Sequence, residues 1–201
     1  MTTFFLIRHA LTDAIGRYLP GTAPGTPINE AGRSEVAALV ERLRNVPLSA
    51  VIAGPLERAQ QTALPIAESH GLRLQVDPLF SEFSVGDWTL RPFSELAADS
   101  GWQRFNTARS VSRPPNGELM LEVQQRAVVR LLQLAEEHPS ASLAIVSHGD
   151  VIRAALMYFL GMPIDLFLRV DVLPATVNVV TFDGHTPVVR QVNGGIDPPV
   201  G

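Results

Sequence analysis

The chain of 201 residues contains no cysteine, which excludes disulfide bonds, thiolate-bound metal ions and a cysteine nucleophile. It has no run approaching the roughly 20 consecutive apolar residues of a membrane-spanning helix. The segment before Arg8 also lacks the basic region and the long apolar stretch of a secretory signal. We therefore expect a cytoplasmic protein with no membrane partner.

Excess positive charge is missing as well. The formal net charge is −4 and the sequence pI is near 5.7. Because nucleic-acid binding calls for clustered excess Lys and Arg, we expect no nucleic-acid partner, whereas a small anionic substrate needs only local positive charge. The motifs H-E-x-x-H, P-loop and G-x-G-x-x-G are absent, so the familiar zinc, nucleotide and dinucleotide signatures support no function here.

Apolar runs indicate the central strands. The hydrophobic share of 46% can form one sizeable core in a chain of this length, which predicts a single domain over residues 1–201. Runs without polar alternation are typical of strands buried on both faces of a parallel sheet. They occupy residues 4–7, 48–53 and 142–147.

Helical patterns separate these runs. Asn29 can cap a helix from about Glu30, and Pro55 is expected in the first turn of a second helix, where proline is tolerated. Further expected elements are a short strand at 72–76, helices from 116–118 to 138 and from about 150 to 160, and a hairpin of strands 177–182 and 187–192. The alternation predicts an α/β fold, a three-layer sandwich whose mainly parallel central sheet is flanked by helices.

Three segments do not fit this alternation. Residues 16–29 hold many Gly and Pro residues and are expected to form a loop beside the end of the first strand. Residues 89–116 are expected to form a lid-like insertion of short helices and loop, and 194–201 a flexible tail. His138, at a helix end, and His185, in the hairpin turn, are expected to have no catalytic role.

Chemistry-bearing side chains follow the predicted strands. In open α/β sheets, ligands bind at the carboxyl ends of the strands, so side chains placed there converge on one edge. The candidates from four separate segments are Arg8, His9, Arg58, Glu82 and His148. Each has a simpler explanation when considered alone, such as a solvated strand end, a surface arginine or a turn glutamate.

Together these side chains indicate phosphoryl chemistry. Two guanidinium groups and the amides of a helix start can neutralise a phosphoryl group, and either histidine can attack phosphorus. Glu82 lies between Phe80 and Phe83, whose shielding would keep its carboxyl protonated and able to protonate a leaving oxygen. A divalent metal site built from the histidines and Glu82 is the competing interpretation, but the two arginines cannot lose their charge and would repel the cation.

The segments that carry these residues resemble the histidine phosphatase superfamily, the family of the cofactor-dependent phosphoglycerate mutases and of many small phosphatases. They are Arg8-His9-Ala10 with Thr12, GPLERAQQTA at 54–63, Glu82 with Gly86-Asp87-Trp88, and SHGDVIR at 147–153. Their order follows the family and spans nearly the whole chain. The resemblance implies a phosphoglycerate mutase-like fold.

The resemblance also implies the role of each site residue. His9 would be the nucleophile that becomes phosphohistidine, and Glu82 the general acid for the leaving group and then the base for water. The phosphoryl oxygens would be bound by Arg8, Arg58, His148 and Gly149. The resemblance also makes His148 a catalytic residue. The resemblance implies no metal and no organic cofactor.

Departures from the family pattern concern the substrate. They remove polar contacts to a small phosphorylated acid, and so favour a phosphatase acting on a small phosphorylated metabolite. Ala10 replaces a glycine, Ile15 an asparagine, Gly25 an aspartate and Thr89-Leu90 a Glu-Gly pair, and the insertion between Trp88 and Pro115 is short for a mutase. The alternatives are a mutase-type phosphoryl transferase and a non-catalytic phosphate-binding module, and a homodimer is one option for the assembly.

Overall fold

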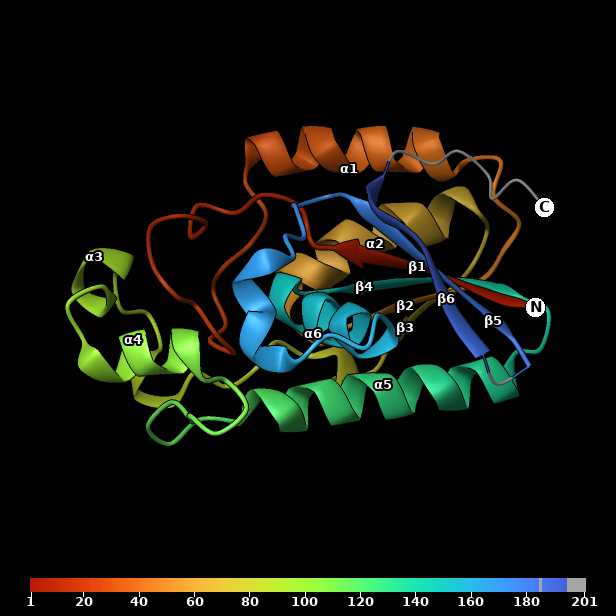
Figure 1. The fold of residues 1–201 in the computed structure, drawn as a ribbon. Helices are drawn as coiled ribbons and strands as arrows, with labels where there is room; N and C mark the ends of the chain where they lie inside the picture. Colours follow the sequence, from red (N-terminus) through yellow and green to blue (C-terminus); the bar gives the residue numbers. More distant parts are fainter. Residues whose placement is uncertain (185, 195–201) are drawn as a thin grey trace.

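A six-stranded sheet forms the centre of the computed structural model, which describes residues 1–184 and 186–194 (Figure 1). The strand order is β3-β2-β4-β1-β5-β6. The strands are β1 (Thr2–Arg8), β2 (Leu48–Ala53), β3 (Leu74–Val76), β4 (Ser142–Ser147), β5 (Val177–Asp183) and β6 (Thr186–Gly194). The first four run parallel, and the β5–β6 hairpin joins β1 in the antiparallel sense, which confirms a mainly parallel sheet.

The two faces of the sheet are covered by different helices. The helices are α1 (Glu30–Leu43), α2 (Glu57–Ser69), α3 (Phe93–Leu96), α4 (Ser100–Thr107), α5 (Met120–Glu137) and α6 (Gly149–Phe159). Phe5 and Ile7 of β1 pack in the hydrophobic cluster that includes α1 and α2, whereas Phe4 and Leu6 pack in the cluster that includes α5 and α6. This alternation follows from the two-residue period of a strand and produces the expected three-layer sandwich.

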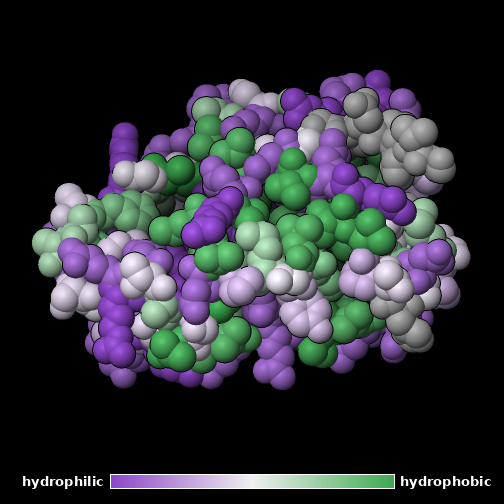
Figure 2. Space-filling model, in the orientation of Figure 1, coloured by the Kyte–Doolittle hydropathy of each residue, from purple (hydrophilic) through white to green (hydrophobic). Residues whose placement is uncertain are grey.

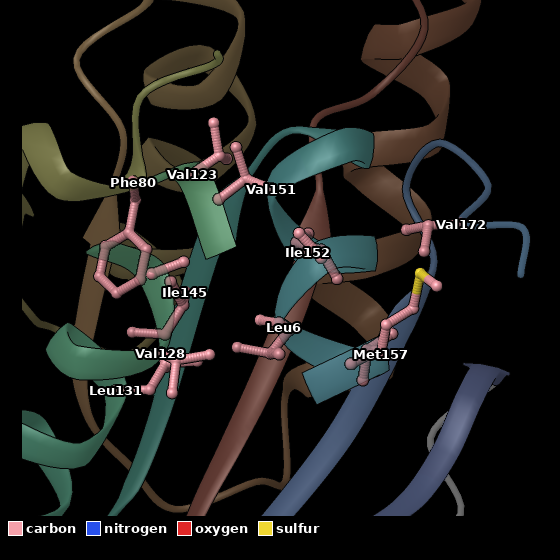
Figure 3. Close-up of a cluster of buried hydrophobic side chains, with 14 of the residues drawn as sticks. Leu6, Phe80, Val123, Val128, Leu131, Ile145, Val151, Ile152, Met157 and Val172 are labelled. Carbon is pink, nitrogen blue, oxygen red and sulfur yellow. The ribbon is translucent and has the colours of Figure 1, made fainter. Parts of the chain in front are cut away.

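Figure 3 shows the layer on the α5 and α6 side. Leu6 of β1 and Ile145 of β4 lie between Val128 of α5 and Ile152 of α6, and all four are buried. The central position of β1 and β4 explains why their sequences are apolar on both faces. The outer surface over α6 and the short helix η3 (Ile164–Arg169) mixes polar side chains with exposed apolar ones such as Leu168 (Figure 2).

The start of one helix agrees with its sequence signal, and the starts of two others lie later in the chain than predicted. The Asn29 side chain accepts a hydrogen bond from the backbone N–H of Gly32 and so caps α1. The prediction that Pro55 lies in the first turn of α2 is wrong, because the helix begins at Glu57 with Leu56 as its N-cap. The helix expected from 116–118 begins at Met120, where the Glu122 side chain accepts from the N–H of Leu119.

The loop after β1 and the insertion lie together at the carboxyl ends of the parallel strands (Figure 1). Backbone hydrogen bonds join them, from Leu19 N–H to Arg91 O and from Phe93 N–H to Arg17 O. In the insertion, Trp88 packs edge-on against Trp102 and Phe105 with ring centroids 5.3 and 5.5 Å apart. The short helices α3 and α4 confirm the secondary structure expected for this segment. The contacts between the aromatic rings pack the segment together.

Some sequence expectations concern residues at the end of the chain. His185 and residues 195–201 of the predicted tail lie outside the described residues. Within residues 1–184 and 186–194, none of the helices combines the length and hydrophobicity that a membrane crossing requires.

Candidate active site

The two histidines lie side by side because their strands are neighbours. β1 and β4 pair in parallel with Arg8 opposite Ser147, so His9 and His148 follow at the same edge. The backbone N–H of His9 donates to Ser147 O at 2.9 Å and extends the ladder by one residue. The ring centroids lie 5.2 Å apart at an interplanar angle of 61°, and both side chains are buried.

The position of the His9 ring defines which nitrogen is free. Nδ1 lies 2.8 Å from the carbonyl oxygen of Ala10, and because a carbonyl only accepts, Nδ1 carries the hydrogen. Burial, followed by the positive charge of Arg58, lowers the pKa of His9 to about 3. His9 is therefore neutral near pH 7, and its Nε2 holds a lone pair that can attack an electrophile.

Arg58 comes from the first turn of α2 and is only 1% exposed. Its Nη2 donates to Gly21 O at 2.8 Å, which ties α2 to the loop after β1. Thr62, one turn later, accepts from the backbone N–H of Ala10 at 3.0 Å and donates to Arg58 O at 2.8 Å. Thr62 therefore links the residue after His9 to the helix that carries Arg58.

Both arginines keep buried nitrogens without partners. Among the described residues, Nε and Nη1 of Arg58 and Nε of Arg8 form no hydrogen bond. Nη1 of Arg8 donates to Val172 O at 2.6 Å, which holds the guanidinium in place. Buried donors normally have partners, so unpaired N–H groups on two neighbouring cations indicate a site for an anion.

His148 is fully buried as the N-cap of α6. Neither of its ring nitrogens has a hydrogen-bond partner among the described residues, and Nδ1 lies 3.7 Å from Oε2 of Glu82. Burial, and then the charges of His9 and Arg58, lower its pKa well below the usual range. A neutral His148 has one ring N–H to donate and one nitrogen that accepts.

Glu82 follows the short helix η1 (Pro78–Phe80), and its side chain is 14% exposed. The shielding expected from its position between two aromatic residues is observed as burial of the carboxyl group. Burial, and then the negative charge of Asp150, raise the pKa of Glu82 to about 7, against the opposing effect of Arg58. Glu82 is thus protonated in a large part of the molecules at neutral pH, as a general acid requires.

Arg8, His9, Arg58 and Glu82 line one cavity of about 170 Å³. Its wall is formed by the end of β1, the following loop, the starts of α2 and α6, and the insertion. The lining residues are Arg8, His9, Thr12, Ala14, Ile15, Gly16, Tyr18, Leu19, Pro20, Arg58, Glu82, Phe93, Gly149, Asp150 and Arg153. His148 is not among them, since its ring is covered in this structure.

Gly149 begins α6 directly beneath the Arg8 guanidinium. A Cβ added there would lie 3.1 Å from Nε and 3.2 Å from Cζ of Arg8. We expect Gly149→Ala to displace Arg8 and to lower kcat/KM for a phosphomonoester by roughly 10- to 100-fold, because small misplacements of a positioning group are costly. Steady-state kinetics with circular dichroism would test this.

The matched control is Gly101→Ala in α4, where an added Cβ would meet Trp88 at an ordinary 3.6 Å and the carboxylate of Asp99 at 3.1 Å. Its kcat/KM should stay close to that of the parent protein. Unchanged kinetics in Gly149→Ala would show that Arg8 does not need its present position.

Sequence reasoning assigned no role to several residues of the cavity. Asp150 and Arg153 lie one turn apart on α6, and Phe93 reaches the cavity from the insertion. The spacing of 150 and 153 after His148 is a helical signal that could have indicated the first two. Among the described residues no three His, Asp or Glu side chains are grouped so that they could hold a metal ion.

Comparison with known proteins matches nearly the whole chain. The model of the histidine phosphatase superfamily (branch 1) matches residues 4–194. Probable phosphoglycerate mutase GpmB of Yersinia pestis (strain Pestoides F) is 30% identical over 166 residues, which cover 81% of this chain and 77% of the relative.

Solved structures of similar fold include two bacterial proteins. The structure of Bacillus stearothermophilus YhfR has a TM-score of 0.90 at 27% identity and covers 98% of both chains. That of a putative alpha-ribazole-5'-P phosphatase from Escherichia coli has a TM-score of 0.86 at 26% identity and covers 96% of both chains.

Proposed function

Because the chain belongs to the histidine phosphatase superfamily, we propose that it hydrolyses a small phosphomonoester through a phosphohistidine formed on His9. The observation that carries this proposal is the neutral His9, whose Nε2 is free while Nδ1–H is bound to Ala10 O. His9 lines a cavity beside two arginines that have buried, unpaired N–H groups.

In the first step Nε2 of His9 bonds to phosphorus as the bond from phosphorus to the ester oxygen breaks. The proton of Glu82 passes to that oxygen, so the alcohol leaves neutral. Arg8 and Arg58 bind the phosphoryl oxygens, with the N–H of Gly149 at the start of α6 and a ring N–H of His148 completing the set.

In the second step water attacks the phosphohistidine. Glu82, now a carboxylate, accepts a proton from that water while the bond from phosphorus to Nε2 breaks. Inorganic phosphate leaves, and His9 and Glu82 return to their starting states. Every proton in the cycle is accounted for by these two side chains and water.

A mutase remains the second candidate, since one relative is named a probable phosphoglycerate mutase. A mutase must exclude water and hold the dephosphorylated acid for return transfer. Ile15 lines the cavity with an apolar side chain, and Gly25 is not among the lining residues. Neither offers an anchor for a substrate carboxylate, so water should capture the intermediate.

We expect 3-phosphoglycerate, where it is accepted, to give inorganic phosphate faster than 2-phosphoglycerate, even with 2,3-bisphosphoglycerate supplied to prime the enzyme. Phosphorus NMR of the reaction mixture resolves the two products. Isomerisation that clearly outruns phosphate release would overturn the phosphatase assignment in favour of the mutase. Failure to hydrolyse p-nitrophenyl phosphate would favour a non-catalytic phosphate-binding module.

A further inference from the structure

We propose that Asp150 makes the cavity select phosphomonoesters whose alcohol part carries an ammonium group over those that carry a carboxylate. This inference rests on the proposed function, because it concerns the alcohol part of the ester that the cavity would receive. Asp150 would act as a specificity-determining residue.

Asp150 lies next to the phosphate-binding groups. It follows Gly149, whose Cα lies under the Arg8 guanidinium, and it lines the same cavity as His9 and Glu82. The cavity of about 170 Å³ is smaller than the roughly 300–1,000 Å³ of pockets for drug-sized ligands. A phosphoryl group bound at the arginines therefore leaves room for only a few further atoms inside the cavity that Asp150 also lines.

The carboxylate of Asp150 is available to a ligand. Its side chain is 27% exposed, and among the described residues it accepts no hydrogen bond. The nearest cation is Arg153, whose Nη1 lies 3.9 Å from Oδ1 of Asp150. Arg153 is bound more closely to Asp171, to which its Nη2 donates at 3.1 Å.

Other charges near this end of the cavity do not replace that carboxylate. Arg109 is buried and packs on the rings of Phe105 and Phe167 at 4.3 and 4.0 Å, outside the cavity lining. Arg153 packs on the same Phe167 ring at 4.7 Å and divides its charge between two carboxylates. Among the described residues Asp150 thus has one ion-pair contact, the long one to Arg153, and the charge of Arg8, which also acts on it, would be shared with a bound phosphoryl group.

The remaining wall of the cavity is mixed. Ile15, Leu19 and Phe93 are apolar and cannot hydrogen-bond to a carboxylate through their side chains, whereas Thr12, Tyr18 and Arg153 are polar. A second negative charge on the substrate would be repelled by Asp150, because like charges brought together are strongly disfavoured, and among the remaining lining residues only Arg153 carries a charge that opposes this repulsion. An ammonium group would instead gain a charge-assisted hydrogen bond.

The test compares three esters that differ mainly in one terminal group. O-phosphoethanolamine carries an ammonium, 2-hydroxyethyl phosphate a hydroxyl and phosphoglycolate a carboxylate. We expect kcat/KM to fall in that order, and Asp150→Asn to reduce the ratio of the first to the last by about tenfold or more. An effect of Asp150 on Glu82 that is common to all three substrates cancels, because the ratio compares kcat/KM for two substrates of the same protein at one pH.

The matched control is Asp183→Asn, which makes the same change in net charge at the far end of β5, next to the amino end of β1. It should leave the ratio unchanged. An unaltered ratio in Asp150→Asn would overturn the proposal. A preference for phosphoglycolate in the parent protein would also overturn it and would indicate that Arg153 recognises the leaving group.

Failure of the proposed function has a different signature. If p-nitrophenyl phosphate and all three esters resist hydrolysis, the phosphatase assignment fails, while calorimetric affinities for the same esters still measure the charge preference. Stronger binding of O-phosphoethanolamine than of phosphoglycolate, lost in Asp150→Asn, would uphold the role of Asp150. Equal affinities would refute it.

Discussion

His9→Ala is expected to lower turnover of any phosphomonoester by about 10⁴-fold or more and to abolish labelling of the protein by a phosphate donor. The physical reason is that Nε2 of His9 is the neutral, unpaired nitrogen in the cavity, with Nδ1–H bound to Ala10 O. Quench-flow labelling followed by peptide mapping would measure the loss.

The control for this change is His138→Ala. His138 is the C-cap of α5, and its carbonyl oxygen, which the substitution keeps, accepts from Thr2. This variant should keep both turnover and labelling. If a phosphorylated histidine survives in His9→Ala, then His148 would have to be the nucleophile, and the assignment of the two histidines would be reversed.

Glu82→Gln should reduce turnover by roughly 10²- to 10⁴-fold for an alkyl phosphate and much less for p-nitrophenyl phosphate. An alkoxide needs a proton to leave, whereas a nitrophenolate departs unaided. The pKa of Glu82 is raised to about 7, so its acid form dominates below that pH and disappears above it. Turnover of the alkyl phosphate should therefore fall by about tenfold per pH unit above pH 7.

The pH profile separates a chemical role from a structural one. In Glu82→Gln the fall above pH 7 should vanish, since glutamine does not titrate. Glu136→Gln, on the exposed part of α5, is the matched control and should keep the profile. Equal losses on both substrates with an unchanged profile would mean that Glu82 only positions its neighbours.

Burial at the carboxyl edge of the sheet sets the protonation state of the side chains in the site. Arg8 and Arg58 are cations with unpaired buried N–H groups, while His9 and His148 are neutral because they are buried beside those arginines. The same burial that keeps the histidines neutral raises the pKa of Glu82. One desolvated edge of the sheet thus favours a neutral nucleophile and a neutral acid at the same pH.

Local patterns in the sequence were enough to predict the layers and the approximate place of the site. Apolar runs without alternation are typical of buried parallel strands, and β1, β2 and β4 formed at those runs. Because parallel strands present their carboxyl ends at one edge, residues that follow them could be expected to meet. The order of the strands therefore predicts that His9 and His148 lie close together.

The properties that make these residues reactive depend on contacts between distant segments, which no local pattern encodes. The Arg58 guanidinium is held by the bond from its Nη2 to Gly21, 37 residues away, and that of Arg8 by Val172, 164 residues away, while other nitrogens of both stay unpaired among the described residues. The raised pKa of Glu82 depends on burial and then on the charge of Asp150, which a different strand and helix bring near. Residue types and the periodicity of hydrophobic residues are present in the sequence itself. Burial and charge pairing, in contrast, are set by the packing of elements that lie far apart in the sequence.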